Sequence, residues 1–434
     1  MCYAPLWGGK LKKPEIRCEF CKVRSSNVYY GWYVVAAAFA VMFVGFACAY
    51  SYSAFFPDLQ REFDASRATI SSVFSVGGAM YFILGAISGP LSDRYGPRWV
   101  SAFGMAVLGL GFVFAGTAEG LTAVYLGFGL GIGIGLGFSY VPSVGAVQPW
   151  FVEKRGFASG LAVSGIGVGT LLGPLIASGL ISIADWRSAF IVMGAVTLVL
   201  GVAAALILEN DPSKRGGNAS GASAIQSHDS LTLSEAIRTR PFILMYLSAA
   251  ALSFALFVPF VHLVPYALDN GLSATTGALL IGLIGVGSTV GRFAVGGVAD
   301  RFGRQTVYST CFVGVAVIFF VWLVSSGLVT LAIFAFAFGT FYGGFVALAP
   351  AVTVDYFGTR SAGATIGVIY SSVAIGTAFG PPFAGYVYDE FGSYRVAIFV
   401  GELAAIAGAL LSMALPLPER WRAARNVSHL NNKP

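Results

Sequence analysis

Charged residues are scarce in this chain. Only 11% of its 434 residues are Asp, Glu, Lys or Arg, whereas a soluble globular domain carries about 25%. Mean hydropathy is +0.77 and 56% of the residues are hydrophobic, which is more apolar surface than a soluble core can bury. The composition excludes an ordinary soluble enzyme and predicts an all-α integral membrane protein in a lipid bilayer. The net charge of +6 is therefore assigned to loops at the membrane surface rather than to nucleic-acid binding.

Cysteine is also infrequent, and the five residues do not indicate a disulfide framework. Cys48 and Cys311 fall in apolar stretches and are expected to be buried thiols. Cys18 and Cys21 have a metal-like spacing, but only Cys2 stands near as a third ligand, so an incidental reduced pair is favoured over zinc. The sequence shows no nucleotide motif and no pairing of a nucleophile with a base. We expect no metal, no cofactor and no enzymatic activity.

The apolar residues are gathered in runs of about 20 residues or more, the length of a membrane-spanning helix. We expect twelve such spans, near residues 31–56, 70–91, 99–117, 121–148, 156–183, 187–208, 242–268, 276–298, 305–325, 328–354, 361–386 and 394–416. They divide the chain into a basic tail (1–28), a six-helix bundle (29–208), a polar linker (209–240), a second six-helix bundle (241–416) and a second tail (417–434).

Basic residues select the orientation of these spans. Lys and Arg concentrate in both tails, in the linker and in every second loop, whereas the remaining loops hold few of them. Because cytoplasmic loops carry the excess of basic residues, we expect both termini in the cytoplasm of a multi-pass protein of the plasma or inner membrane.

The two halves repeat. The stretch 89–98, Gly-Pro-Leu-Ser-Asp-Arg-Tyr-Gly-Pro-Arg, returns at 296–304 as Gly-Gly-Val-Ala-Asp-Arg-Phe-Gly-Arg, an offset of 207 residues (300 − 93) between the aspartates. Gly173-Pro174 returns at the same offset as Gly380-Pro381. Repeats of this kind predict two six-helix bundles related by a pseudo-twofold axis along the membrane normal, with a binding site between them.

The repeated turn holds Asp93 and Arg94 in the first half and Asp300 and Arg301 in the second. Its charges are suited to lock neighbouring helix ends in one conformation and to release them in another. Positive cytoplasmic charge beside a turn glycine is the simpler alternative. With this doubled motif, residues 30–416 resemble the major facilitator superfamily, which implies twelve helices in a 6+6 fold and alternating access.

A narrower resemblance is to the monocarboxylate transporters. It rests on Tyr30-Gly31-Trp32 at the start of the first span, on Trp150-Phe-Val-Glu-Lys-Arg before the fifth, and on Arg292 in the eighth. The related bacterial oxalate/formate exchangers look similar over the same regions. The resemblance implies that Arg292 binds the substrate carboxylate. The chain departs from the family pattern at Tyr50 and Ser288, where the animal carriers have a lysine and an aspartate of their proton pathway.

Charge counting within the spans points to the kind of substrate. Arg292 is a permanent cation inside an apolar run, where insertion costs at least about 2.5–3.5 kcal/mol. One guanidinium matches one carboxylate through two parallel hydrogen bonds, whereas a dianion such as oxalate needs a second cation. An arginine bonded to backbone carbonyls, or one that reaches the cytoplasmic interface, is the alternative.

Several other polar side chains lie at a similar depth. Tyr140, Tyr342 and Tyr370 carry hydroxyls that would orient a bound acid, and Ser288 lies one turn before Arg292. His262 lies between two prolines in the seventh span, and its titration range makes it the candidate for proton coupling. A neutral histidine satisfied by a carbonyl is the equal alternative.

These observations predict a secondary active transporter of a small monocarboxylate anion of the lactate or pyruvate type. Symport with a proton is favoured, because an anion that enters alone moves against an inside-negative potential. An anion exchanger of the oxalate/formate type and a membrane sensor that binds without transport are the alternatives.

Overall fold

The computed structural model describes residues 29–151, 155–212, 230–325, 327–358 and 361–423, and most of these residues are helical. Within this part of the chain, twelve helical spans are long and apolar enough to cross a membrane. The predicted all-α fold with twelve spans is therefore confirmed. The predicted N-terminal tail (1–28), residues 213–229 of the linker and residues 424–434 of the second tail lie outside the described residues.

The first six spans end at residue 205. The first of them is broken at Ser51, and two others contain π-helical turns at Tyr125–Leu130 and Thr197–Gly201. The α-helices are α1 (Tyr30–Tyr50), α2 (Tyr52–Phe63), α3 (Arg67–Tyr95), α4 (Pro97–Gly116), α5 (Leu121–Val124), α6 (Gly131–Val147), α7 (Arg155–Ile183), α8 (Trp186–Val196) and α9 (Val202–Ala205).

The last six spans follow a short helix, α10, whose first turn is closed by a capping box between Thr232 and Glu235. The seventh span is broken at Phe257, as the first span is at Ser51. The α-helices are α10 (Leu233–Ala236), α11 (Arg240–Leu256), α12 (Val258–Asp269), α13 (Ala274–Phe302), α14 (Arg304–Val324), α15 (Leu328–Phe357), α16 (Ala362–Phe391) and α17 (Arg395–Met413).

The repeat in the sequence is also a repeat of helix boundaries. Helices α3 and α13 both have 29 residues. Ser66 and Ser273 cap them, each accepting the backbone N–H three residues further on. Gly96 and Gly303 end them with φ angles of 85° and 89°, a conformation that glycine adopts without steric cost. Equivalent residues therefore begin and end equivalent helices.

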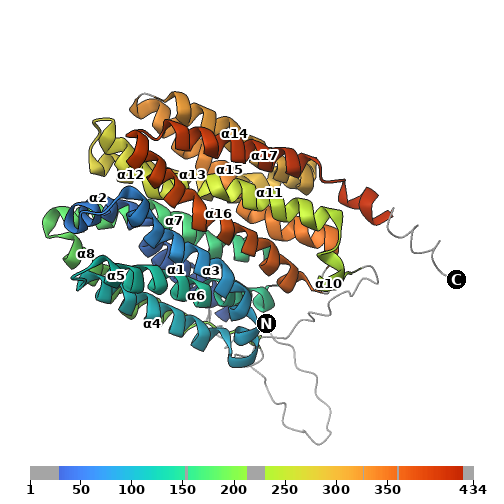
Figure 1. The fold of residues 1–434 in the computed structure, drawn as a ribbon. Coiled ribbons are helices and arrows are strands. Elements are labelled where there is room, and N and C mark those ends of the chain that lie inside the picture. Colours follow the sequence, from blue (N-terminus) through green and yellow to red (C-terminus); the bar gives the residue numbers. More distant parts are fainter. Residues whose placement is uncertain (1–28, 152–154, 213–229, 326, 359–360, 424–434) are drawn as a thin grey trace, which may run out of the picture.

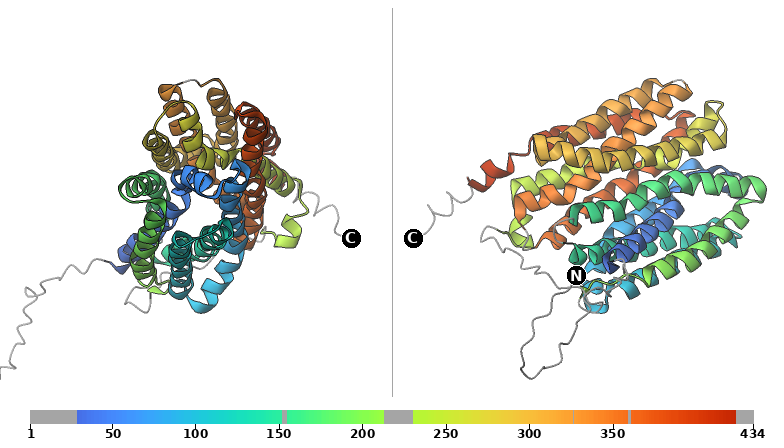
Figure 2. Two further views of the ribbon diagram at one scale, coloured as in Figure 1. Left: turned by 60° about the vertical axis from the view of Figure 1, so that its left-hand side comes forward. Right: turned by 180° about the vertical axis from the view of Figure 1, so that it is seen from behind.

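The two halves lie side by side as separate groups of helices, blue to green and yellow to red (Figures 1 and 2). Helix α3 packs against α16, and α7 packs against α13, so these four helices form most of the contact between the halves. Helix α2 also packs against α12. We call the end of the bundle at which α1 begins and α17 finishes the termini end. The opposite end, where α2 finishes and α3 begins, is the far end.

Helices α13 and α15 approach one another closely because glycines face the contact. A Cβ atom added to Gly291 would lie 2.0 Å from the carbonyl oxygen of Thr340, and one added to Gly343 would lie 2.2 Å from that of Ser288. No other side chain fits at these points without a shift of the backbone. This contact fixes the segment of α13 that carries Ser288 and Arg292.

We expect Gly291→Ala to separate α13 from α15 and to destabilise the protein by about 1–3 kcal/mol, the usual cost of overpacking. Gly297→Ala is the matched control, because a Cβ atom at that position on the same helix meets nothing within 4 Å. Thermal unfolding of the purified protein in detergent measures both effects. Equal unfolding temperatures for the two variants would show that the close contact does not matter for stability.

Candidate functional site

A cavity of about 660 Å³ lies between the two halves. Its walls come from α1, α3, α6 and α7 of the first half and from α11, α13, α15 and α16 of the second. Asp93 at the end of α3, Gln148 after α6 and Gly363 at the start of α16 all line it. Because these three positions lie at the termini end, the cavity extends from the middle of the bundle to that end.

Four of the predicted substrate residues line this one cavity, namely Arg292, Tyr140, Tyr342 and Tyr370. Ser288 does not line it. Its side chain is 2% exposed, and its hydroxyl has no hydrogen-bond partner in the described part of the chain. The close approach of α15 at Gly343 covers Ser288, although helical spacing places it on the same face as Arg292.

The guanidinium of Arg292 is buried, with 7% of the residue exposed. Its Nε, Nη1 and Nη2 atoms make no hydrogen bond to any residue that the structure describes. Neither a carbonyl nor a carboxylate of the described chain serves as its partner. A buried charge without a partner is costly, so an anion that reaches the cavity gains strong hydrogen bonds at this point.

Tyrosine hydroxyls surround this cation. The charge of Arg292 acts on the hydroxyls of Tyr50, Tyr140 and Tyr370, which places all three in its neighbourhood. Tyr50 and Tyr342 share a hydrogen bond of 3.1 Å between their hydroxyls across the two halves. The hydroxyl of Tyr370 donates to the carbonyl of Val346 over 3.4 Å. The cation therefore faces neutral donors that suit a carboxylate and a neighbouring hydroxyl or carbonyl group.

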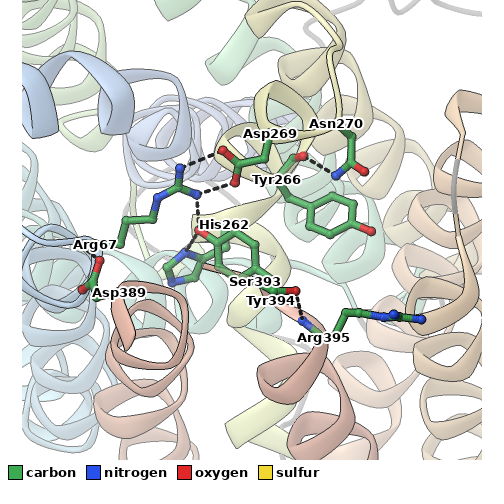
Figure 3. A network of polar contacts seen from close by, with 9 residues as sticks. All are labelled: Arg67, His262, Tyr266, Asp269, Asn270, Asp389, Ser393, Tyr394 and Arg395. Atoms are coloured by element: carbon green, nitrogen blue, oxygen red, sulfur yellow. Dashed lines mark hydrogen bonds and ion pairs between the residues drawn. The ribbon is translucent and has the colours of Figure 1, made fainter. Parts of the chain in front are cut away.

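The far end is closed by Arg67, the first residue of α3 (Figure 3). Its guanidinium donates two hydrogen bonds of 2.6 and 2.8 Å to the carboxylate of Asp269 and one of 2.8 Å to the hydroxyl of Tyr394. The carboxylate of Asp389 accepts the backbone N–H groups of Arg67 and Ala68, each at 2.9 Å. One residue of the first half thus holds three residues of the second.

His262 belongs to this closed end and does not line the cavity. Its Nε2 lies 2.8 Å from the carbonyl oxygen of Pro381, and its Nδ1 lies 2.9 Å from the hydroxyl of Tyr394. Because a carbonyl only accepts, Nε2 carries the proton and Nδ1 of the neutral ring accepts from Tyr394. Burial raises the pKa of the Tyr394 hydroxyl, which keeps it protonated as this donor. In the structure His262 is a neutral ring with both nitrogens bonded.

The turn residues lie apart at the termini end. Asp93 lines the cavity and forms no ion pair with any described residue. Arg94 and Arg301 are exposed and lie over the rings of the tyrosine and phenylalanine that follow them. Asp300 lies outside the residues whose side chains the structure describes. The structure thus has its far end closed and its cavity reaching the termini end.

Sequence reasoning missed the closing residues and part of the cavity wall. Asp269 and Asp389 carry no local motif, and Arg67 is one of the few basic residues in the loops of its side. Tyr50 was noted only for the lysine that it replaces, yet it lines the cavity. That replacement was the one available signal, because a residue at a ligand position of a similar family is itself a candidate for the site.

The sequence profile of the Major Facilitator Superfamily matches residues 37–305 and again 249–433. The chain belongs to the major facilitator superfamily. It is therefore a multi-pass membrane protein and a secondary transporter, not an enzyme. Monocarboxylate transporter 11 of Homo sapiens is 29% identical over 402 residues, which cover 89% of this chain and 83% of that protein.

Two further comparisons agree with this placement. Monocarboxylate transporter 13 of Rattus norvegicus is 27% identical over 394 residues and 89% of each chain. The solved structure of a bacterial homologue of the human lysosomal transporter Spinster, described as inward-facing and unoccupied, superposes with a TM-score of 0.63. It shares 16% identity, covers 91% of this chain and 96% of its own, and shows the fold alone.

We expect Arg67→Ala and Asp269→Asn to weaken the closed far end, since each removes hydrogen bonds to a charged group worth about 1.5–3 kcal/mol. Spin labels at Glu119 and Asn270, on far-end loops of the two halves, measure the separation by pulsed electron paramagnetic resonance. Both variants should shift the population toward longer distances.

Arg61→Ala is the control for this experiment. Arg61 pairs with Asp58 on its own helix and its side chain is 77% exposed, so this ion pair makes no contact between the two halves. Unchanged distances in both Arg67→Ala and Asp269→Asn would show that this pair does not hold the far end shut.

Proposed function

We propose that the protein transports small monocarboxylates of the lactate and pyruvate type, together with a proton, by alternating access. The observation that carries this proposal is Arg292, a buried cation without a partner in a cavity between the halves. A guanidinium binds a carboxylate through two parallel hydrogen bonds, and one cation matches one negative charge. The distant similarity to monocarboxylate transporters supports the same class of substrate.

The surrounding side chains complete the proposed site. The hydroxyls of Tyr140, Tyr342 and Tyr370 would orient the acid beside the guanidinium, and their rings form an apolar wall. Ser288 would join the site if α15 moves away from it during the cycle.

The direction of access follows from the charge distribution. We assign the termini end, which carries most of the basic residues, to the cytoplasm of the plasma or inner membrane. The described structure then corresponds to a carrier that receives or releases its substrate on the cytoplasmic side. In the opposite state the turns with Asp93, Arg94, Asp300 and Arg301 would exchange partners and close that side.

In proton-coupled transport, His262 would be the residue within the spans that takes up the proton.

An anion exchanger of the oxalate/formate type is the second candidate function, and a specific observation favours it. Tyr50 and Ser288 occupy the positions of two proton-pathway residues in the animal carriers, and both nitrogens of His262 are already bonded.

We expect Arg292→Ala to lower kcat/KM for lactate uptake by about 100-fold or more, because the carboxylate loses its bidentate partner. Arg292→Lys should also lose most activity, since an ammonium does not reproduce the fork of the guanidinium. Uptake of radiolabelled lactate into proteoliposomes measures both variants.

Arg420→Ala is the control, because it removes an exposed cation that lies after α17 and outside the cavity. Full activity of Arg292→Ala at normal expression would refute the assignment of Arg292 as the carboxylate ligand.

A proton gradient separates symport from exchange. Symport predicts that an inward proton gradient stimulates uptake into empty vesicles, whereas exchange requires vesicles preloaded with a carboxylate. We expect His262→Gln to abolish the stimulation, because glutamine can keep both hydrogen bonds of the ring but cannot take up a proton. Stimulation that survives in His262→Gln would remove His262 as the proton carrier.

A further inference from the structure

The walls of the cavity are far more aromatic than a three-carbon acid requires. Tyr81 and Tyr140 pack edge-on with ring centroids 5.8 Å apart, and both contact Phe46 at 6.0 Å. Tyr81 also lies 4.4 Å from the ring of Phe82, and Phe82 lies 5.9 Å from Phe257. All five rings line the cavity, so a continuous aromatic band extends away from Arg292.

This band begins beside the cation. Tyr140 and Tyr370 both interact electrostatically with Arg292, and Tyr370 lies 6.5 Å from Phe82 between ring centroids. A carboxylate held by Arg292 would therefore leave the rest of its molecule within the cavity that this band lines. The methyl group of lactate or pyruvate is too short to cover this surface.

The size of the cavity agrees with a larger ligand. Its volume of about 660 Å³ lies within the range of about 300–1,000 Å³ found for sites that enclose drug-sized molecules. Part of this space belongs to the approach from the termini end, where small residues such as Gly89, Pro90 and Ala364 form much of the wall. The aromatic side chains, in contrast, concentrate around the inner part of the cavity.

The polar groups restrict the ligand further. Among the described lining residues, Arg292 is the one cation and Asp93 the one acid, and Asp93 lies near the termini end. The remaining polar lining consists of tyrosine hydroxyls and Gln148. No carboxylate stands beside Arg292 to pair with an ammonium group in the described part of the wall. An amino acid is therefore disfavoured relative to an acid that carries one negative charge and no positive charge.

We propose that the cavity binds aryl-substituted 2-oxo and 2-hydroxy monocarboxylates, such as phenylpyruvate and phenyllactate, in preference to their three-carbon parents. The carboxylate pairs with Arg292, the 2-oxygen meets the tyrosine hydroxyls, and the aromatic ring packs against Tyr81, Phe82 and Phe257. This inference rests on the proposed role of Arg292 and adds the chemical class of the group attached to the carboxylate. Phe82 is the residue that determines specificity for the ring.

Calorimetric titration of the purified protein with matched acids tests the proposal. We expect phenylpyruvate to bind about tenfold more tightly than pyruvate, and phenyllactate more tightly than lactate by a similar factor. Phenylalanine, which carries an ammonium group in place of the 2-hydroxyl group of phenyllactate, should bind at least tenfold more weakly than phenyllactate. Arg292→Ala should abolish binding of every acid, which separates specific binding from partition into detergent.

Phe82→Ala should lower the affinity for phenylpyruvate far more than the affinity for pyruvate, so that the roughly tenfold ratio between the two falls toward one. Phe82→Leu, which keeps an apolar side chain of similar size, serves if the alanine variant does not fold. Phe103→Ala is the control, because this ring is 54% exposed and does not line the cavity.

The outcomes distinguish this inference from the function on which it rests. Equal affinities for the aryl acid and its parent, both lost in Arg292→Ala, would overturn the inference and leave the proposed monocarboxylate site standing. Binding of neither acid to the intact protein would overturn both. A ratio that survives in both Phe82 variants would remove Phe82 as the residue that determines specificity.

Discussion

The structure depends on one buried positive charge that the described chain leaves unpaired. Arg292 and Arg67 have the same chemistry but opposite surroundings. Arg67 receives the carboxylate of Asp269 from the same chain, and the far end is closed there. Arg292 receives none, and a cavity is found beside it. An arginine with an internal carboxylate joins two parts of a protein, whereas one without such a partner is available to an external anion.

The two halves share a repeated backbone but contribute different side chains to the cavity. The backbone is symmetric, since α3 and α13 share their length, their caps and their final glycines. The charges are not symmetric, because the position of α3 that corresponds to Arg292 is Gly85, which also lines the cavity. The second half therefore supplies the cation, whereas Phe46, Tyr81 and Tyr140 of the first half supply much of the aromatic wall. A ligand with a carboxylate and a ring would touch both halves, which is how binding influences their relative position.

The fold could be predicted from the sequence because membrane spans are long apolar runs and because the repeat marks equivalent helix ends. Arg292 could be predicted because a charge within such a run is rare. The closed end could not, since Arg67 and Asp269 are 202 residues apart and each belongs to an ordinary polar loop boundary. Ser288 shows a second limit. Helical spacing places it beside Arg292, but the glycine of a neighbouring helix decides that it is covered.

The hydrogen bonds of His262 determine how protonation of its ring would affect the closed far end. The carbonyl of Pro381 can only accept, and this fixes the direction of the linked hydrogen bonds. Arg67 donates to the hydroxyl of Tyr394, and that hydroxyl donates to Nδ1 of His262. A proton on Nδ1 would turn this acceptor into a donor and leave the Tyr394 hydroxyl to find another partner. It would also place a second positive charge near Arg67 in a buried site, where like charges repel strongly. Protonation of His262 would therefore oppose the closed far end, and a proton carried there would be coupled to the opening of that end rather than to the carboxylate at Arg292.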